Sequence, residues 1–356
     1  MTASRSGSLL LLSLALCIAT GCNTFGRTSL RNGRGAYNEV INRTEDEQIL
    51  AMIVRQRYDE TYGMLSVTSV TASLKVGASL GANVGIGSDS SYAGNLVPFS
   101  AGATYEENPT ISYTPLRGEQ FVERMLAPIT ADQTLLLASM STGEINAMKL
   151  LLRRANGVPN PAYASTPVRS DFDRFVDAFA RFRQEGVLNP VRSDDGSYRL
   201  LFHDYSPQQA ADIGEMLHEI GIRRAPAPGA ELSLPLRFFV GSARGDGLDL
   251  ETPSALEVID VAGQGIDVPA EHVSEGFARS ASLEPSDRFL AIHSSSHRPW
   301  NAAVAVEHRG YWFYIDSRDA RSKQSFKILR TLIGMRLDKG PGAEPAPVLT
   351  IGVGGH

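Results

Sequence analysis

The chain has 356 residues, of which 42% are hydrophobic, and this is long enough to form two domains with real cores. The formal net charge of -5 and the pI of about 5.9 argue against a nucleic-acid-binding protein, which would carry a basic domain. We therefore expect no nucleic-acid partner.

The first 22 residues are organised as a secretory leader. Arg5 supplies positive charge, and Leu9 to Ile18 form an apolar segment shorter than the roughly 20 residues of a transmembrane helix. The segment ends at Ala19-Thr20-Gly21-Cys22, which resembles the lipobox of bacterial lipoprotein precursors. The resemblance implies a signal peptide over residues 1–21, cleavage between Gly21 and Cys22, and a diacylglycerol on the Cys22 sulfur. The alternative is an ordinary secretory signal with an incidental cysteine.

The residues around Cys22 also bear on the location. Asn23 stands where such lipoproteins carry aspartate as an inner-membrane retention signal, so the resemblance implies the outer membrane, facing the periplasm. The acyl chains on Cys22 would hold the protein to membrane lipid by burying many CH₂ groups. Cys17 lies inside the leader, so we expect no intramolecular disulfide, no structural zinc site and no catalytic thiol in the mature chain. Residues 22–33 are predicted to be a lipidated tether.

Residues 34–156 are predicted to form a helical region that carries a long β-hairpin. An apolar face predicts a helix from Tyr37 to Tyr58, in which Thr44-Glu45-Asp46-Glu47 has the form of a capping box. The hairpin is expected over about residues 64–115. Further helices are predicted at Gly118–Leu126, Asp132–Met140 and Gly143–Ala155.

The hairpin is predicted from two runs of alternation. Every even residue from Val70 to Ile86 is apolar and every odd residue between them is small or polar, which assigns the two kinds of residue to opposite faces of a strand. A second run starts at Val97, and Pro98 interrupts it. The apolar face that we expect to meet a membrane or a partner includes Val70, Leu74, Val76, Leu80, Val84, Ile86, Phe99 and Tyr105.

Two functions of this hairpin are open. Strands of about 9–11 residues cross a bilayer with apolar residues outward, but two strands alone leave edges that cannot face lipid. A membrane hairpin therefore requires a homo-oligomeric ring, and the protein would be a pore or export-channel subunit. Alternatively, the apolar face packs on helices of the same subunit or on an envelope protein partner, because an exposed flat hairpin would aggregate.

The Pro-rich segment Gly157–Thr166 is expected to be a linker before an α/β domain at residues 167–356. The alternation of helical and strand patterns there predicts an α+β (or α/β) fold class, in which helices and a two-stranded hairpin precede a mixed domain. The predicted helices are Asp171–Gln184, Pro207–Ile220, Pro253–Val261 and Arg321–Leu337. The predicted strands are Tyr198–His203, Leu232–Val240, Phe289–Ser294, Ala302–Glu307, Tyr311–Ile315 and Val348–Val353.

One loop is a candidate for catalysis. Ile292 to Trp300 holds His293, His297 and three serines. A hydrolase would need a base beside a hydroxyl and an orienting acid, which Asp316 or Asp319 could supply. A polar surface loop and a helix N-cap are the alternative interpretations. Because the sequence has no Gly-x-Ser-x-Gly elbow, P-loop, dinucleotide fingerprint or zinc motif, we expect a non-enzymatic protein without metal or cofactor.

The last predicted helix carries a basic stripe of Lys323, Lys327 and Arg330 opposite Phe326, Leu329 and Ile333. Such a stripe is either a solvated helix face or a partner site.

Several segments resemble a family of uncharacterised proteobacterial outer-membrane lipoproteins, which implies an outer-membrane lipoprotein and no particular activity. We therefore expect a lipid-anchored, periplasm-facing scaffold or binding component of an envelope assembly. A homo-oligomeric pore subunit and a periplasmic hydrolase using His293 or His297 are the alternatives. The segments that carry the resemblance are Arg34–Asn38, Glu47–Leu50, Ile53–Tyr58, Glu106–Pro115, Trp312–Ile315 and Ser322-Lys323.

Overall fold

The computed structural model describes residues 35, 38–82, 99–116, 119–140, 144–164, 171–224, 226–227, 229–238, 244–279, 288–337 and 349–352. The predicted signal peptide and tether, with Gly21 and Cys22, lie outside these residues, as do Val84 and Ile86. The chain divides into two compact units. Unit 1 comprises Met1–Tyr62 and Glu119–Asp338, and unit 2 comprises Gly63–Gly118 and Lys339–His356.

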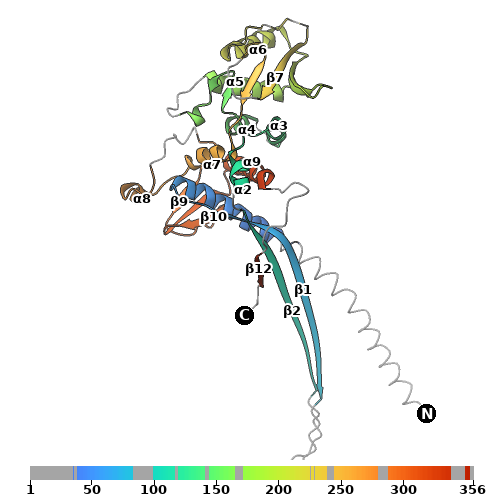
Figure 1. Ribbon diagram of the computed structural model, residues 1–356, viewed down its shortest axis with the longest axis vertical. Helices are drawn as coiled ribbons and strands as arrows, with labels where there is room; N and C mark the ends of the chain where they lie inside the picture. Colours follow the sequence, from blue (N-terminus) through green and yellow to red (C-terminus); the bar gives the residue numbers. More distant parts are fainter. Residues whose placement is uncertain are drawn as a thin grey trace, which may run out of the picture. The chain divides into compact units, whose positions relative to one another are not determined.

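Unit 2 contains the predicted hairpin. The strands β1 (Met64–Ala82) and β2 (Phe99–Leu116) pair antiparallel along their whole length (Figure 1). The register shifts once, between Val67 and Ser69. The C-terminal strand β12 (Leu349–Gly352) pairs with β2 at Thr110–Tyr113, so the sheet has the order β1-β2-β12. The sequence predicted two strands here and placed the last strand in the α/β domain.

Unit 1 begins with a helix over residues 38–57, close to the predicted bounds. Ile49, Leu50, Ile53 and Val54 are buried, as the apolar face predicted. The capping box at Thr44 is not formed, because Thr44 lies inside the helix and its hydroxyl donates a hydrogen bond to the Ile41 carbonyl at 2.9 Å.

A six-stranded sheet lies in unit 1, in the order β4-β3-β8-β7-β6-β5. Only the β7–β8 pair is parallel, and the other neighbours are antiparallel. These strands are β3 (Arg154–Ala155), β4 (Val158–Pro159), β5 (Leu188–Arg192), β6 (Tyr198–Phe202), β7 (Leu232–Phe238) and β8 (Leu248–Glu251).

Two amphipathic helices, α5 (Asp171–Gln184) and α6 (Pro207–Glu219), pack against this sheet (Figure 1). Their apolar sides share one buried cluster with alternate residues of β6, β7 and β8. Phe172, Phe175, Phe182 and Phe202 are fully buried there, so burial of large apolar groups holds this part of unit 1 together.

The helix α9 (Ala320–Leu337) contacts the helices α2, α3, α4 and α7 of unit 1. A three-stranded antiparallel sheet, in the order β10-β11-β9, packs on the same helix through β11. The elements are α2 (Glu119–Leu126), α3 (Ala131–Ser139), α4 (Glu144–Leu151), the 3₁₀ turn η1 (Pro161–Tyr163), α7 (Ala255–Gly263), α8 (Ala270–Ser274), β9 (His293–Ser295), β10 (Ala302–His308) and β11 (Tyr311–Asp316).

The α+β fold class is confirmed by these helices and mixed sheets. The prediction of a linker at Gly157–Thr166 is wrong for its first part, because β4 and η1 lie there and belong to unit 1. Asn160 explains this, since its buried side chain donates to the Lys149 and Leu152 carbonyls at 2.8 and 2.6 Å. The end of the helix predicted to Ala155 is instead β3, which pairs with β8.

Candidate functional site

The register of the hairpin aligns the apolar positions of its two strands. Val70 stands opposite Ile111, Val76 opposite Tyr105, Leu80 opposite Ala101 and Ala82 opposite Phe99. Residues directly opposite in an antiparallel pair belong to the same face of the sheet. The structure therefore brings six of the predicted face residues, Val70, Leu74, Val76, Leu80, Phe99 and Tyr105, onto one face.

The other face is polar along the same stretch. The register places Thr71 opposite Thr110, Ser73 opposite Asn108, and Lys75 opposite Glu106. One exception interrupts the apolar face, where Leu74 stands opposite Glu107. The hairpin thus combines one apolar face with one polar face, and the separation is sharpest from Val76 to Ala82.

His293 is held by an acidic partner that lies far from it in the sequence. It belongs to β9, and its Nδ1 donates to an Asp267 oxygen at 2.9 Å. The other Asp267 oxygen accepts from Arg288 at 2.5 Å. The hydrogen bond with Asp267 raises the pKa of His293 above its usual value, and the same bond lowers the pKa of Asp267. This arrangement orients the imidazole and fixes its tautomer.

The parts of a hydrolytic site are divided between the two histidines. His293 has the acid Asp267, while His297 Nδ1 lies 2.9 Å from the Ser296 hydroxyl. Among the hydrogen bonds of the described residues, no histidine joins both a carboxylate and a serine hydroxyl, as a catalytic triad would require. Asp319 accepts from the Ser322 amide at 3.0 Å, so it is the N-cap that one interpretation predicted.

The loop that follows His293 is fixed to β11. The Asn301 side chain donates to Asp316 at 2.6 Å, and the Ser317 amide donates to the Asn301 carbonyl at 2.8 Å. The Arg318 amide also donates to Asp316, at 2.8 Å. Asp316 therefore ties the loop to the strand end rather than serving a histidine.

The residues of the basic stripe on α9 make different contacts. Arg330 pairs with Glu45 and Asp46 on the first helix at 3.0 Å each, which attaches α9 to that helix. Lys323 and Lys327 line a cavity of about 240 Å³, which Arg330, Asp46 and residues of β10 and β11 also border. The stripe thus serves helix packing through Arg330 and borders a groove that carries both basic residues and Asp46.

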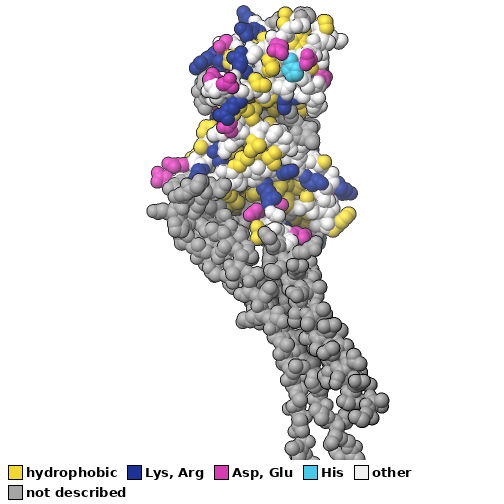
Figure 2. All heavy atoms as spheres, turned by 90° about the vertical axis from the view of Figure 1, so that its right-hand side faces the viewer, with side chains coloured by type: hydrophobic (Ala, Val, Ile, Leu, Met, Phe, Trp, Pro, Cys, Tyr) yellow, Lys and Arg dark blue, Asp and Glu magenta, His cyan; other side chains and the backbone are white. Residues whose placement is uncertain are grey.

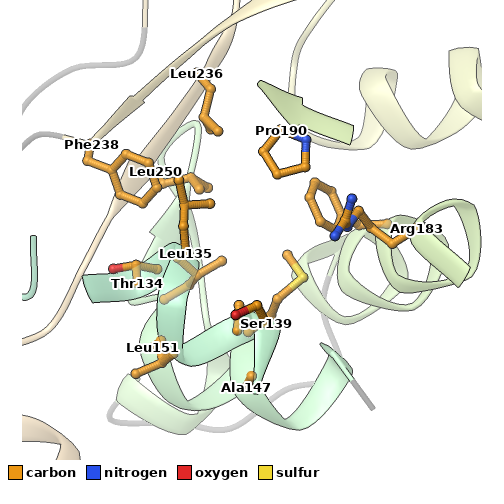
Figure 3. A pocket seen from close by; sticks show the side chains of 14 residues that line it. Thr134, Leu135, Ser139, Ala147, Leu151, Arg183, Pro190, Leu236, Phe238 and Leu250 are labelled. Carbon is orange, nitrogen blue, oxygen red and sulfur yellow. The ribbon is translucent and has the colours of Figure 1, made fainter. Parts of the chain in front are cut away.

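An apolar cavity of about 150 Å³ lies among α3, α4, α5 and the six-stranded sheet (Figure 3). Its walls include Leu135, Met148, Phe179 and Phe238. The hydroxyls of its lining residues Thr134 and Ser139 donate to carbonyls of their own helix region, at 2.9 and 2.7 Å. The cavity can accept an apolar group but offers little chemistry for catalysis.

Sequence reasoning missed a buried polar cluster around Tyr58. Its hydroxyl lies 2.6 Å from His272 Nδ1, and its ring packs against His308 and Phe313. Burial raises the pKa of Tyr58 to about 12 and lowers the pKa of His308. The members come from three separate parts of the chain, so no local pattern could have identified them.

Within the part of the chain that the structure describes, no group of three or more His, Cys, Asp or Glu residues could hold a metal ion. None of the described helices has both the length and the apolar character to cross a membrane. On the face of unit 1 drawn in Figure 2, basic, acidic and hydrophobic side chains are interspersed. No family model, curated protein or solved structure matches the chain.

Proposed function

We propose that this protein is a lipid-anchored lipoprotein of the outer membrane that faces the periplasm and serves as a non-enzymatic scaffold or binding component of an envelope assembly. The lipobox at Ala19–Cys22 supports the anchor, and the hairpin is the binding element. A long apolar strand face left in water is an aggregation hazard, so a partner that covers this face would keep the protein soluble and functional.

The register of β1 and β2 is the observation that carries this proposal. Apolar positions of the two strands align with each other from Val76 opposite Tyr105 to Ala82 opposite Phe99. An antiparallel pair with one apolar face and one polar face needs apolar groups against the first, from its own core or from another molecule. The matched face is therefore suited to association.

Replacement of Cys22 by alanine tests the anchor. The variant cannot carry a thioether-linked diacylglycerol, so it should move from the membrane fraction to the soluble periplasmic fraction. A variant of the leader cysteine, Cys17→Ala, is the matched control and should fractionate as the wild-type protein does. An unchanged membrane location of Cys22→Ala would contradict lipid anchoring.

Photocrosslinking tests the binding element. A photoreactive phenylalanine analogue at Phe99 or Tyr105, on the apolar face, should capture a second envelope protein in cells. The same analogue at Ser100 or Thr104, on the polar face, is the matched control and should capture far less. Equal capture from both faces, or capture from neither, would contradict a partner on the apolar face.

A homo-oligomeric pore is the second candidate, and the strand edges favour it. In the part of unit 2 that the structure describes, β1 has no strand on its outer edge, and β12 covers β2 only at Thr110–Tyr113. Copies could therefore add edge to edge. At about 3.3 Å per residue, β1 is about 60 Å long, which exceeds a hydrocarbon core of about 30 Å. Crosslinks from Phe99 between two copies of this chain would favour the pore over the scaffold.

A further inference from the structure

Trp300 is displayed in full to solvent. Its side chain is 91% exposed, whereas the next most exposed large hydrophobic residue described, Leu126, is 56% exposed. The chain has only two tryptophans, and the second, Trp312, lies on the strand beside which this loop starts. An indole in water forgoes a large hydrophobic gain, and tryptophan is enriched at interfaces, where its ring contacts a partner and its N–H donates a hydrogen bond.

The loop that carries Trp300 is held at both ends. It leaves the sheet after Ser295, which pairs with Trp312, and the Ser295 hydroxyl accepts from the His297 amide at 3.2 Å. It returns at Asn301, which donates to Asp316. An ordered loop therefore carries the indole, so that binding of a ligand would lose little conformational entropy of the loop.

Polar and aromatic residues share the sheet face beside this loop. Alternation along β11 buries Phe313 and Ile315 on one face and assigns Trp312, Tyr314 and Asp316 to the other. The Arg298 guanidinium lies 5.1 Å from the centre of the Trp312 ring. The His293 ring lies 5.6 Å from that of Tyr314, and Asp267 holds its Nδ1, so Nε2 is the atom that it can offer to a ligand.

We propose that this Trp300 surface, made of Trp300, Arg298, Trp312, Tyr314 and His293, binds a glycan. A pyranose ring has a C–H face that is attracted to the negative face of an indole, and a rim of hydroxyls that both donate and accept hydrogen bonds. Arg298, His293 and the Tyr314 hydroxyl supply groups for that rim. The surface offers one free aromatic face surrounded by hydrogen-bonding groups, which matches a sugar.

Two other partner classes fit this surface less well. A bilayer with anionic lipids would meet the carboxylates of Asp316 and Asp267 beside the arginines, so the charge is mixed rather than basic. A protein hot spot is a tryptophan at the well-packed centre of an interface, whereas the loop that carries Trp300 is polar and contains Ser296, His297 and Asn301.

The sugar that we name is a strand of β-1,4-linked N-acetylated amino sugars, the glycan that a periplasmic protein would meet. This choice rests on the proposed location. The acetamido group adds a carbonyl that accepts from Arg298 and an N–H that donates to His293 Nε2, and its methyl group adds apolar contact for an indole.

The test uses the full-length protein in mild detergent, with purified bacterial sacculi and with a tetramer of N-acetylglucosamine. Isothermal titration calorimetry reports binding of the tetramer to the wild-type protein and to each variant, so Trp312 stays in place in every protein compared. Trp300→Ala should weaken binding roughly tenfold and abolish co-sedimentation with sacculi, while Trp300→Phe should keep most of the binding. Leu136→Ala, which truncates a 53% exposed residue on α3, is the matched control.

Binding of Trp300→Ala as tight as that of the wild-type protein would overturn the proposal. It would also be overturned if neither sacculi nor the tetramer bound, or if Trp300→Ala weakened binding to phosphatidylethanolamine–phosphatidylglycerol bilayer discs but not to either glycan. The Cys22→Ala fractionation and the crosslinks from Phe99 do not involve this surface. Their failure is thus distinguishable from failure of the glycan proposal.

Discussion

Unit 1 and the hairpin of unit 2 are built by different kinds of contact. In unit 1, polar and apolar residues meet across long stretches of chain, as when Tyr58 meets His272 or Arg330 meets Asn42. In the hairpin, the two strands pair residue by residue in a single register with one irregularity. Contacts between residues far apart in the sequence determine the structure of unit 1, whereas a two-residue alternation along the sequence determines that of the hairpin.

The two regions also differ in where their apolar residues lie. Unit 1 buries large side chains such as Phe175 and Phe202 within its own core. The hairpin gathers its apolar residues on one face of a thin sheet. Unit 1 is therefore the part that carries its own stability, and the hairpin face is the part that we propose to bind.

The largest effect is expected from a core truncation in unit 1. Phe175→Ala removes a fully buried ring between α5 and the sheet, and it should lower the free energy of unfolding by about 3–5 kcal/mol. Urea unfolding monitored by tryptophan fluorescence checks this, because Trp300 and Trp312 both lie in unit 1. The surface truncation Leu136→Ala should change stability by less than about 0.5 kcal/mol. Equal effects would show that unit 1 does not depend on this core.

A smaller loss is expected from the buried polar pair. Tyr58→Phe keeps the ring but removes the hydroxyl, so His272 Nδ1 loses its partner in a buried setting. The free energy of unfolding should fall by about 1–3 kcal/mol. Tyr311→Phe is the matched control, because its hydroxyl donates to Glu271 at the surface, and its effect should be within about 0.5 kcal/mol. A Tyr58→Phe protein as stable as this control would contradict a stabilising role.

The smallest effect is a pH dependence from His293. Its pKa is raised in the folded protein, so its contribution is complete below the unfolded pKa of about 6.5 and is lost as the pH rises through the folded pKa. Asp267 has a lowered pKa, so its contribution is lost only as the pH falls below about 4. The pair therefore stabilises most between about pH 4 and 6.5.

The free energy of unfolding at pH 6 and at pH 8, in the wild-type protein and in His293→Gln, measures this pH-dependent contribution of the His293–Asp267 pair. The variant should lose less stability than the wild-type protein on going to pH 8. The difference should be below about 1 kcal/mol, because both side chains are about 40% exposed and solvent screens them. His308 has a lowered pKa and an opposite slope, but it is common to both proteins and cancels in the comparison. Identical pH profiles would contradict the His293–Asp267 contribution.

Much of the fold could be predicted because its signals are local. The strand alternation located the hairpin, and helical periodicity located α5, α6 and α9. The strand β5 was missed because Pro190 interrupts it, and β8 because its Leu-Asp-Leu-Glu sequence contains two acids. The buried Asp249 of β8 is explained only by contacts with Arg237 and the Arg244 amide. Such partners lie in other segments and leave no local pattern.

For the loop around His293, too, only the local part could be predicted from the sequence. The sequence identified the Ile292–Trp300 loop from its histidines and serines. It could not identify Asp267 and Arg288, which lie outside the loop and reach His293 only through the fold. It also could not show that Trp300 is exposed, because an indole in a sequence gives no sign of whether it is buried.

The mass of the acylated protein together with any protein that co-purifies with it, extracted in mild detergent and measured by light scattering with the detergent subtracted, tests the central claim most directly. Leu80→Arg and Ser79→Arg introduce the same charge at adjacent positions on opposite faces of β1. We predict that the wild-type and Ser79→Arg proteins have masses above that of one chain, and that Leu80→Arg falls to the mass of one chain. A wild-type protein with the mass of one chain, or equal masses for the two variants, would contradict association through the apolar face.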